Sequence, residues 1–550
     1  MRRMPRRMIF RKSILLLLIL LFMFPASIST AEQVDSLGWE IIVPGIEYSK
    51  IQLPDPNNVF VVRMNRSNTN LTLESTIAQG KLAEGRETVS GMFQRYDQAL
   101  NYWGGSANPP TWGMRNQAVV AINGSYFDWV TGVPQGGQIQ SGWYAKRFDD
   151  LGGWSGFGWK VDRSTFIGEC ADHRPEKQLI TYPAKGTTQQ ITRVNDYRDA
   201  NELVLYTPQY NSHTGTSSSG VEVVVEMIRP TMILPTPAKA IGIVREIHNN
   251  AGNSLIPFNA IVLSASGSAA EKLLQNAEVG SEVYVSQEIT AYLADCTTAD
   301  GDYWTKTYSS IQGAFFFLRN NQIRDFNDDP GATSRNPRTA IAYNDQYVFF
   351  IVVDGRDTQN SIGMTIHQLA VLVRDRLGAS WGVAQDGGGS STLVINGQVV
   401  NNTFCNIYTC MGDYQIFLPF ITKNSYNGQQ VQQPEIEAIR SAAGIERPVA
   451  NGMLMVIALP AAYSTSYLPG NQVITTRSSA LRLGPGTNYE SFATLPTGTR
   501  GTILQQMNGL QGVLAKGTNW WYGNFNGLAG WVAQGDITLG SVASEIDQSR

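Results

Sequence analysis

Between Trp39 and Phe420 the chain consists mainly of short runs of β-branched and aromatic residues, separated by Gly, Asn and Pro. Such runs suit the pleated surface of a sheet, and the interruptions are typical of turns. Helical periodicity is clear in the segment 365–378, where Thr365 and Gln368 form a capping box, and a second helix is expected over Ser268–Ala277. We therefore expect an α+β fold, with a few helices on mainly antiparallel sheet.

The N-terminal 31 residues differ from the rest of the chain. A basic stretch is followed by a short apolar run and then by small residues ending at Ala31. This order predicts a signal peptide at 1–31, and a retained membrane anchor is the alternative. Loss of its six basic residues would move the formal net charge from −3 to −9, which argues against a nucleic-acid partner. We expect a secreted or cell-surface protein.

The remaining 519 or so residues are too many for one ordinary core. We expect a large domain at 37–422, a linker at 423–472 that is rich in Gln, Pro, Ala and Ser, and a small β module at 473–541. In that module, the stretches ALRLGPGTNY and NWWYGNFNGLAGWV resemble a bacterial SH3-like domain. The resemblance implies a small barrel that binds cell-wall or other surface glycan. The alternative for Trp520, Trp521 and Trp531 is core packing.

Cysteines and acidic residues give little sign of a metal. The four cysteines are Cys170, Cys296, Cys405 and Cys410. An even number permits two disulfides in an oxidising compartment, and Cys405 with Cys410 is the natural local pair. The cysteine spacing does not match a zinc site, and the acidic segments around Asp295 and Asp328 lack the spacing of a calcium loop. We expect no metal and no cofactor, with calcium as the alternative.

Two apolar strands each end in an Asp-Gly pair, Asp354-Gly355 and Asp386-Gly387. Polar residues that follow apolar strands are common in functional sites. The second pair lies in the stretch QDGGGSSTL. Its three consecutive glycines are costly to order, so the run implies that the backbone conformation there requires glycine. Either the turn excludes side chains, or backbone N–H groups approach an anion.

Four segments, taken in chain order, resemble the phosphodiester glycosidase family: AINGSYF, PRTAIAY, DGR with GMTIHQLA, and QDGGGSSTL. The resemblance spans about Trp39 to Phe420, and it departs from the family at Ser125, where a second glycine is usual. It implies a hydrolase that cleaves the glycosidic C–O bond of a sugar 1-phosphodiester, with a glycan or sugar phosphate as substrate. The alternatives are a non-catalytic envelope or polysaccharide-binding protein with the same fold, and a phosphodiesterase that cleaves the P–O bond.

The implied reaction sets the candidate residues. A phosphate monoester leaves with a last pKa of about 6, so it needs charge stabilisation more than protonation, and Arg338 and Arg356 are the candidates for that role. An oxocarbenium-like transition state calls for a carboxylate, either as nucleophile or as base for water, and Asp386 is the first candidate and Asp354 the second, with the division of the two roles left open. The candidates for substrate binding are Asn123, Tyr126, Gly387, Gly388, Gly389, Ser390, Ser391 and Thr392. Each candidate also has a structural alternative in a turn, a strand pair or a hairpin flank.

Overall fold

The computed structural model describes residues 37–83, 85–103, 112–148, 155–230, 241–291, 306–404 and 445–540, apart from 170, 288, 315 and 327. The predicted signal peptide, the four cysteines with their predicted disulfides and much of the predicted linker lie outside these residues. The chain divides into two units, Met1–Gly38 and Trp39–Arg550. The second unit holds all the elements described below.

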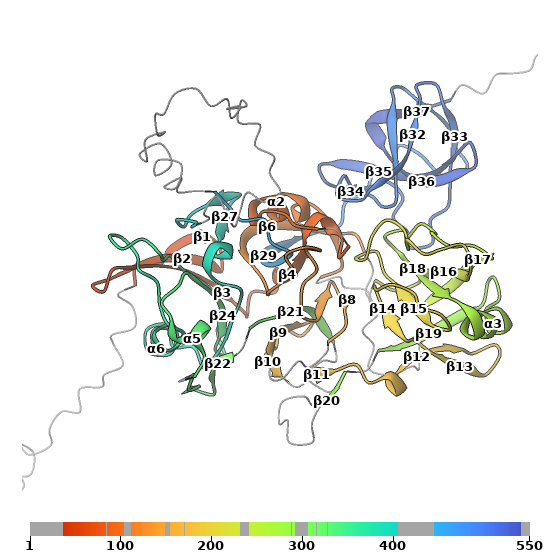
Figure 1. Cartoon of the computed structure of the whole chain (residues 1–550). Coiled ribbons are helices and arrows are strands. Elements are labelled where there is room, and N and C mark those ends of the chain that lie inside the picture. The colour runs from red at the N-terminus through yellow and green to blue at the C-terminus, as the bar shows by residue number, and fades with distance from the viewer. Residues whose placement is uncertain are drawn as a thin grey trace, which may run out of the picture. The chain divides into compact units, whose positions relative to one another are not determined.

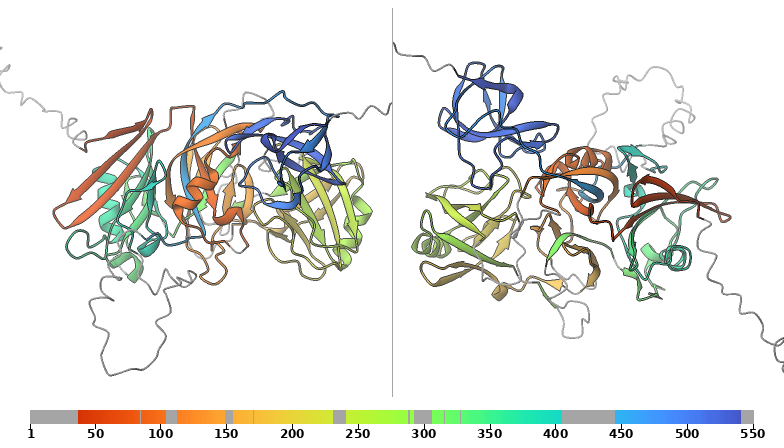
Figure 2. Two further views of the ribbon diagram at one scale, coloured as in Figure 1. Left: turned by 90° about the horizontal axis from the view of Figure 1, so that it is seen from above. Right: turned by 180° about the vertical axis from the view of Figure 1, so that it is seen from behind.

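Strands dominate this unit, so the expected α+β class is wrong and the fold is mainly β (Figures 1 and 2). Within the described residues the α-helices are α2 (Val89–Tyr96), α3 (Gly267–Asn276), α5 (Pro330–Thr333) and α6 (Ile366–Asp375). The two expected helices are confirmed as α3 and α6, and Thr365 with Gln368 forms the predicted capping box. They are short elements between many strands, because the β-branched runs far outnumber the amphipathic ones.

The first sheet has eight strands and carries most of the predicted site. Its order is β1 (Glu40–Val43), β2 (Ile46–Leu53), β3 (Asn57–Asn65), β25 (Tyr347–Val353), β24 (Arg338–Tyr343), β26 (Trp381–Ala384), β22 (Phe316–Arg319) and β23 (Gln322–Ile323). Neighbouring strands are antiparallel throughout. The central strands are apolar on both faces, which matches a sheet covered on both sides.

The second sheet includes a strand from the segment predicted to be a linker. Its order is β28 (Gln398–Val399), β27 (Leu393–Ile395), β6 (Met114–Asn123), β29 (Asn451–Leu459) and β4 (Leu71–Ile77), with β5 (Leu100–Asn101) beside β6. Strand β29 is buried along most of its length and pairs with both β6 and β4. Residues 451–459 therefore belong to the centre of this sheet, because their apolar side chains complete its core.

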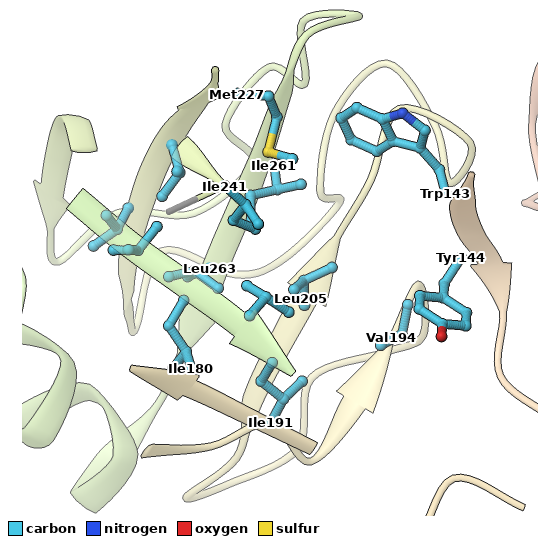
Figure 3. Close-up of a cluster of buried hydrophobic side chains, with 14 of the residues drawn as sticks. Trp143, Tyr144, Ile180, Ile191, Val194, Leu205, Met227, Ile241, Ile261 and Leu263 are labelled. Atoms are coloured by element: carbon cyan, nitrogen blue, oxygen red, sulfur yellow. The ribbon is translucent and has the colours of Figure 1, made fainter. Parts of the chain in front are cut away.

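Three further sheets build the middle of the chain. The five-stranded sheet has the order β10 (Thr165–Glu169), β9 (Ser155–Lys160), β21 (Thr307–Gln312), β7 (Gln138–Gln140) and β8 (Trp143–Lys146), and β11 (Ala171–Asp172) pairs with β20 (Thr290–Ala291). The eight-stranded sheet has the order β13 (Thr187–Gln190), β12 (Gln178–Tyr182), β19 (Glu282–Gln287), β17 (Gly242–Asn249), β16 (Val221–Met227), β18 (Ala260–Ala265), β15 (Leu203–Tyr206) and β14 (Arg193–Val194). Figure 3 shows that apolar side chains from several strands of the sheet β13–β14, among them Ile180 of β12, Leu205 of β15 and Leu263 of β18, form one cluster.

The C-terminal strands do not form the separate SH3-like barrel that was predicted. Their order is β32 (Ser491–Leu495), β31 (Ser479–Arg482), β36 (Leu528–Ala533), β35 (Thr518–Phe525), β33 (Arg500–Ile503), β30 (Gln472–Thr475) and β37 (Ile537–Leu539), with β34 (Val513–Ala515) beside β35. In the part of the chain that is described, β32 and β37 do not pair with each other. Trp520 and Trp531 also belong to the hydrophobic cluster of the sheet that contains β16 and β18. The ring centre of Trp531 lies 5.7 Å from that of Phe258 in this cluster. These tryptophans are core residues.

Candidate active site

Three predicted residues emerge at one edge of the first sheet. Strand β24 begins at Arg338, which lies opposite Val353 at the end of β25, so Asp354 follows at the same edge. Ala340 of β24 faces Ala384 at the end of β26, and Asp386 comes two residues later. Because these strands are antiparallel neighbours, residues far apart in the sequence meet where the strands end.

Asn123, at the end of β6, joins the second sheet to this edge. Its Nδ2 donates a 2.7 Å hydrogen bond to the backbone oxygen of Asp386. Its Oδ1 accepts hydrogen bonds from Thr339 Oγ1 at 2.7 Å and from the N–H of Thr392 at 3.2 Å. Asn123 is fully buried, and the backbone N–H of Asp386 donates to Gly124 at 2.9 Å. Asn123 was predicted to bind substrate, and in the structure its amide fixes the Asp386 loop.

The carboxylate of Asp386 has a polar and cationic environment. Ser390 Oγ donates a 2.5 Å hydrogen bond to Asp386 Oδ2. Burial raises the pKa of Asp386 to about 6, against the opposing effects of the Ser390 hydrogen bond and of the positive charges of Arg447 and Arg356. The pKa of Tyr126 is raised by burial and by the negative charge of Asp386, so the phenol lies in the same electrostatic environment.

Arg447 is a functional candidate that sequence reasoning missed. It is 8% exposed, and its Nη1 donates a 3.3 Å hydrogen bond to Ser390 Oγ. Its guanidinium carbon lies 4.8 Å from the ring centre of Trp129, an indole that is 49% exposed. Arg447 Nε is buried and has no hydrogen-bond partner among the described residues. The apolar run from Met453 to Leu459 is typical of a strand, and such a strand would have placed Arg447 near the sheet. The Gln-, Pro- and Ser-rich residues before it favoured a linker instead.

The glycine run lets two arginines lie against the backbone. A Cβ atom at Gly388 would come 2.9 Å from Arg356 Nη2, and one at Gly389 would come 2.5 Å from Arg447 Nη2. Gly388 also has a φ of +64°, which favours glycine. Its N–H donates to Pro337 at 2.9 Å. The close approach of Arg356 and Arg447 is therefore a sufficient reason for these glycines.

Arg356 is the exposed arginine of the site. It has a φ of +63°, and its Nη2 donates a 3.2 Å hydrogen bond to Asn336 Oδ1. Partial desolvation by the surrounding protein lowers the pKa of Arg356 even though the residue is exposed, burial lowers that of Arg447, and the carboxylate of Asp386 opposes both shifts. The site thus combines one carboxylate, one hydroxyl and two arginines, which we call the Asp386 cluster: Asp386, Ser390, Arg356 and Arg447.

Arg338 is held by the surrounding backbone. Its Nε donates to the Met364 carbonyl at 2.8 Å, and its Nη2 donates to the carbonyls of Gly331 and Ser334 at 2.8 and 2.6 Å. The side chain is buried, which lowers its pKa to about 10. These bonds tie α5 and the segment before α6 to β24, so Arg338 supports the site.

Asp354 lies in a different environment from Asp386. Its Oδ1 accepts hydrogen bonds from Asn401 Nδ2 at 3.2 Å and from the N–H of Asn402 at 3.0 Å. Asn401 also contacts the backbone of Ser391, so Asp354 fixes the turn that follows the glycine run. Burial raises the pKa of Asp354 to about 6. The structure therefore separates the two predicted carboxylates into one with arginine neighbours and one with asparagine neighbours.

The hydroxyl residues of the glycine-rich stretch differ in their surroundings. Ser390 contacts the carboxylate, whereas Ser391 Oγ and Thr392 Oγ1 are buried and have no partner among the described residues. Ser125, the departure from the family pattern, bonds through its N–H to Asn451 Oδ1 at 2.9 Å. Its hydroxyl also contacts Asn451 and lies in a buried network of the second sheet. The change from glycine is accommodated within that network.

Neither a metal centre nor a membrane span emerges from the described part of the chain. No group of three or more His, Cys, Asp and Glu side chains in it is arranged to hold a metal ion. Asp329, from one of the acidic segments, accepts a 2.8 Å hydrogen bond from Gly331 N–H at the start of α5. No helix there combines the length and the apolar character needed to cross a membrane.

Comparison with solved structures gives distant matches. A hypothetical protein from Synechocystis is 14% identical with a TM-score of 0.45, over 76% of this chain and 62% of that one. A protein from Burkholderia pseudomallei described as exported is 18% identical with a TM-score of 0.43, over 74% of each chain. The catalytic domain of zebrafish N-acetylglucosamine-1-phosphodiester alpha-N-acetylglucosaminidase, auto-inhibited by its pro-peptide, is 13% identical with a TM-score of 0.32, over 74% of this chain and 81% of that one.

No curated protein matches the sequence. The chain spans less than two thirds of the Synechocystis protein. A family model does match, and the matched residues include Arg338, Asp354, Arg356 and the whole glycine run, whereas Tyr126 and Arg447 lie outside them. The chain thus carries, at residues 241–409, a segment that matches the phosphodiester glycosidase family.

Proposed function

We propose that this chain hydrolyses the glycosidic C–O bond of a sugar 1-phosphodiester. The observation that carries the proposal is the Asp386 cluster, in which the positive charges of two arginines act on one carboxylate. Asp386 and Arg356 belong to the segment matched by the phosphodiester glycosidase family, and Arg447 lies beyond it. The carboxylate acts at the sugar, and the arginines neutralise the phosphate. A site that only bound a phosphate would be weakened by a carboxylate at its centre.

The leaving group explains why one carboxylate is sufficient. Most glycosidases need a second carboxyl group to protonate the departing oxygen. A phosphate monoester has a last pKa of about 6 and departs as an anion without that proton. Arg356 and Arg447 supply the charge that stabilises it, as planar donors suited to phosphate oxygens. The separation of Asp354 from the Asp386 cluster is consistent with this chemistry.

Asp386 serves as the general base. Water adds to the anomeric carbon while the bond from that carbon to the phosphate oxygen breaks, and the electron pair of that bond leaves with the phosphate. The proton of the attacking water goes to Asp386. A carboxylate with a pKa of about 6 is mostly ionised at neutral pH and is more basic than an ordinary aspartate. Ser390 orients Asp386 through its hydrogen bond to Oδ2.

The substrate is a glycan or sugar phosphate outside the cell. The basic and apolar N-terminal segment supports export, and the acidic balance that remains after its removal makes a nucleic-acid substrate unfavourable. The arginines of the Asp386 cluster select a phosphodiester over a neutral glycoside, because a neutral aglycone would leave their charges without a partner.

Substrate specificity tests the proposal. The panel contains methyl phosphodiesters of the 1-phosphates of glucose, galactose, mannose and N-acetylglucosamine in both anomers, the matching methyl glycosides, and dimethyl phosphate. We expect release of free sugar from at least one 1-phosphodiester, little from the glycosides, and loss of that activity in Asp386→Asn. Turnover of dimethyl phosphate, or full activity in folded Asp386→Asn, would contradict the proposal.

A further inference from the structure

Glu74 of β4 lines a cavity of about 110 Å³, whose lining includes no member of the Asp386 cluster. An outer pocket of about 320 Å³ lies beside it. The two share five lining residues: Gly80, Arg95, Pro208, Asn488 and Tyr489. Because they share a wall, we treat them as one site with an inner chamber, the Glu74 chamber, and an outer pocket.

The walls of the Glu74 chamber combine aromatic rings with planar amides. The rings belong to Tyr96, Tyr102, Trp112, Trp143, Phe258 and Tyr489, and the amides to Asn101, Asn116, Gln140, Gln209 and Asn488. Ligand pockets commonly pair an apolar aromatic lining with a few fixed polar groups. A sugar matches such walls, because its ring has a C–H face that packs on aromatic rings and hydroxyls at its edge that bond to amides.

Two of these amides have unmet hydrogen bonds. Gln209 Oε1 and Asn488 Oδ1 are buried and have no donor among the described residues. Glu74 Oε1 already accepts two hydrogen bonds, from the N–H of Ser141 at 3.1 Å and from its Oγ at 2.8 Å, whereas Oε2 accepts one, from Tyr308 at 2.7 Å, and can accept a second. Buried acceptors without donors are unfavourable. A ligand that fills the chamber must therefore bring O–H or N–H donors.

Charge restricts the ligand to a neutral molecule. The cations at the outer pocket are already paired, Lys81 with Glu490 at 2.5 Å and Arg95 with Glu87 at 2.9 Å. These pairs leave little net charge to attract an anion, and Arg482, which lines the same pocket, disfavours an ammonium ion. The apolar walls disfavour an anion, and they affect Glu74 in the same way: burial raises its pKa to about 7, so its carboxyl group is partly protonated at neutral pH.

We propose that the Glu74 chamber and the outer pocket bind one end of a neutral saccharide, at a site separate from the Asp386 cluster. An exocyclic group of the terminal sugar enters the inner chamber, which is too small for several rings. The sugar then extends into the outer pocket, whose wall adds the hydroxyls of Ser212, Thr487 and Ser491.

Titration calorimetry on the full chain tests this site. The probes are the methyl glycosides of glucose, galactose, mannose and N-acetylglucosamine. We expect at least one to bind, and Gln209→Ala and Asn488→Ala each to weaken it by about three- to tenfold, in line with one lost hydrogen bond. The matched control is Gln322→Ala, which removes an exposed glutamine from β23 and should bind like the wild type.

Several results would overturn the site. One is that none of the four sugars binds at millimolar concentration. Another is that both variants bind as well as the wild type while circular dichroism shows them folded. A crystal structure in the presence of the best probe could also show only water in the Glu74 chamber. If Asp386→Asn abolishes binding and Gln209→Ala does not, the sugar occupies the Asp386 cluster and the inference fails.

Discussion

Arg447 Nη1 donates a 3.3 Å hydrogen bond to Ser390 Oγ, although the two residues are 57 positions apart in the chain. The same hydroxyl donates to Asp386 Oδ2, so the arginine and the carboxylate are connected through one serine. Their charges act on each other, since the pKa shift of each residue includes the other as a cause. An arginine beyond the matched family segment thus completes the Asp386 cluster.

Replacement of Arg447 should reduce catalysis more than stability. We expect Arg447→Ala to lower kcat/KM on the best 1-phosphodiester by about 100-fold, because a charge that stabilises the leaving phosphate is lost. Arg447→Lys should recover part of the activity, since it keeps the charge but not the planar donors. Steady-state kinetics with a parallel thermal melt measure both effects. An unchanged kcat/KM in Arg447→Ala would remove this residue from the mechanism.

Replacement of Arg338 should mainly reduce stability. Arg338→Ala leaves the carbonyls of Gly331, Ser334 and Met364 without their donor. We expect a loss of about 2–3 kcal/mol in the free energy of unfolding, measured by chemical denaturation. At a temperature where the variant is folded, kcat should fall less than in Arg447→Ala. The reverse order of the two kcat values would make Arg338 the phosphate ligand.

The pH dependence of activity should report Asp386. A general base must be ionised, so kcat/KM should rise with pH and level off above a midpoint near 6, the pKa of the buried carboxyl. The measurement is a pH profile of kcat/KM for the free enzyme between pH 4 and 9, with ionic strength held constant. A profile that falls through pH 6 would mean that Asp386 acts in its protonated form.

The same pKa values affect stability. The folded-state pKa values of Asp386 and Asp354 lie at about 6, above their ordinary 3.8, so the folded protein binds these protons more tightly than the unfolded chain. Their contribution to stability is therefore complete below pH 3.8 and is lost as the pH rises through 6. Denaturation at several pH values should show a smaller loss over this interval in Asp354→Asn than in the wild type. An equal loss in both proteins would mean that Asp354 has no raised pKa.

Gly388→Ala separates backbone strain from crowding of Arg356. Gly388 and Gly378 have almost the same φ, +64° and +65°, but a Cβ at Gly378 meets no atom within 4 Å. We expect Gly378→Ala to cost about 1–2 kcal/mol of stability through strain alone. Gly388→Ala should cost as much and should also lower kcat/KM, because its methyl group displaces the Arg356 guanidinium. Equal activity in the two folded variants would show that Arg356 does not need this position.

Local sequence patterns predicted the local elements well. The capping box of Thr365 and Gln368 identified α6, and the Asp-Gly pairs identified the sheet edge where Asp386 lies. The fold class and the domain boundaries were less predictable, because they depend on the pairing of strands that are far apart in the sequence. Strand β29 looked like part of a linker until its partners β6 and β4 were known. Trp531 likewise packs against Phe258, which no local pattern could reveal.

The site was only partly predictable, because its hydrogen bonds also join segments that are far apart in the sequence. Asp386, Ser390 and Arg356 lie together, whereas the glycines, whose N–H groups were predicted to approach an anion, lie against the guanidinium groups of Arg356 and Arg447. Hydrogen-bond partners decide the roles of other residues, and the partners of Arg338 and Asp354 come from distant segments. A one-dimensional pattern cannot separate an arginine bound to carbonyls from one that is free to hold a phosphate.

The most direct test of the central claim is the position of oxygen from solvent in the products. The best 1-phosphodiester is hydrolysed in water enriched in heavy oxygen, and the sugar and the phosphate monoester are analysed by mass spectrometry. Cleavage at the glycosidic C–O bond predicts the label on the sugar and none on the phosphate. The label on the phosphate would mean P–O cleavage and would contradict the proposed function.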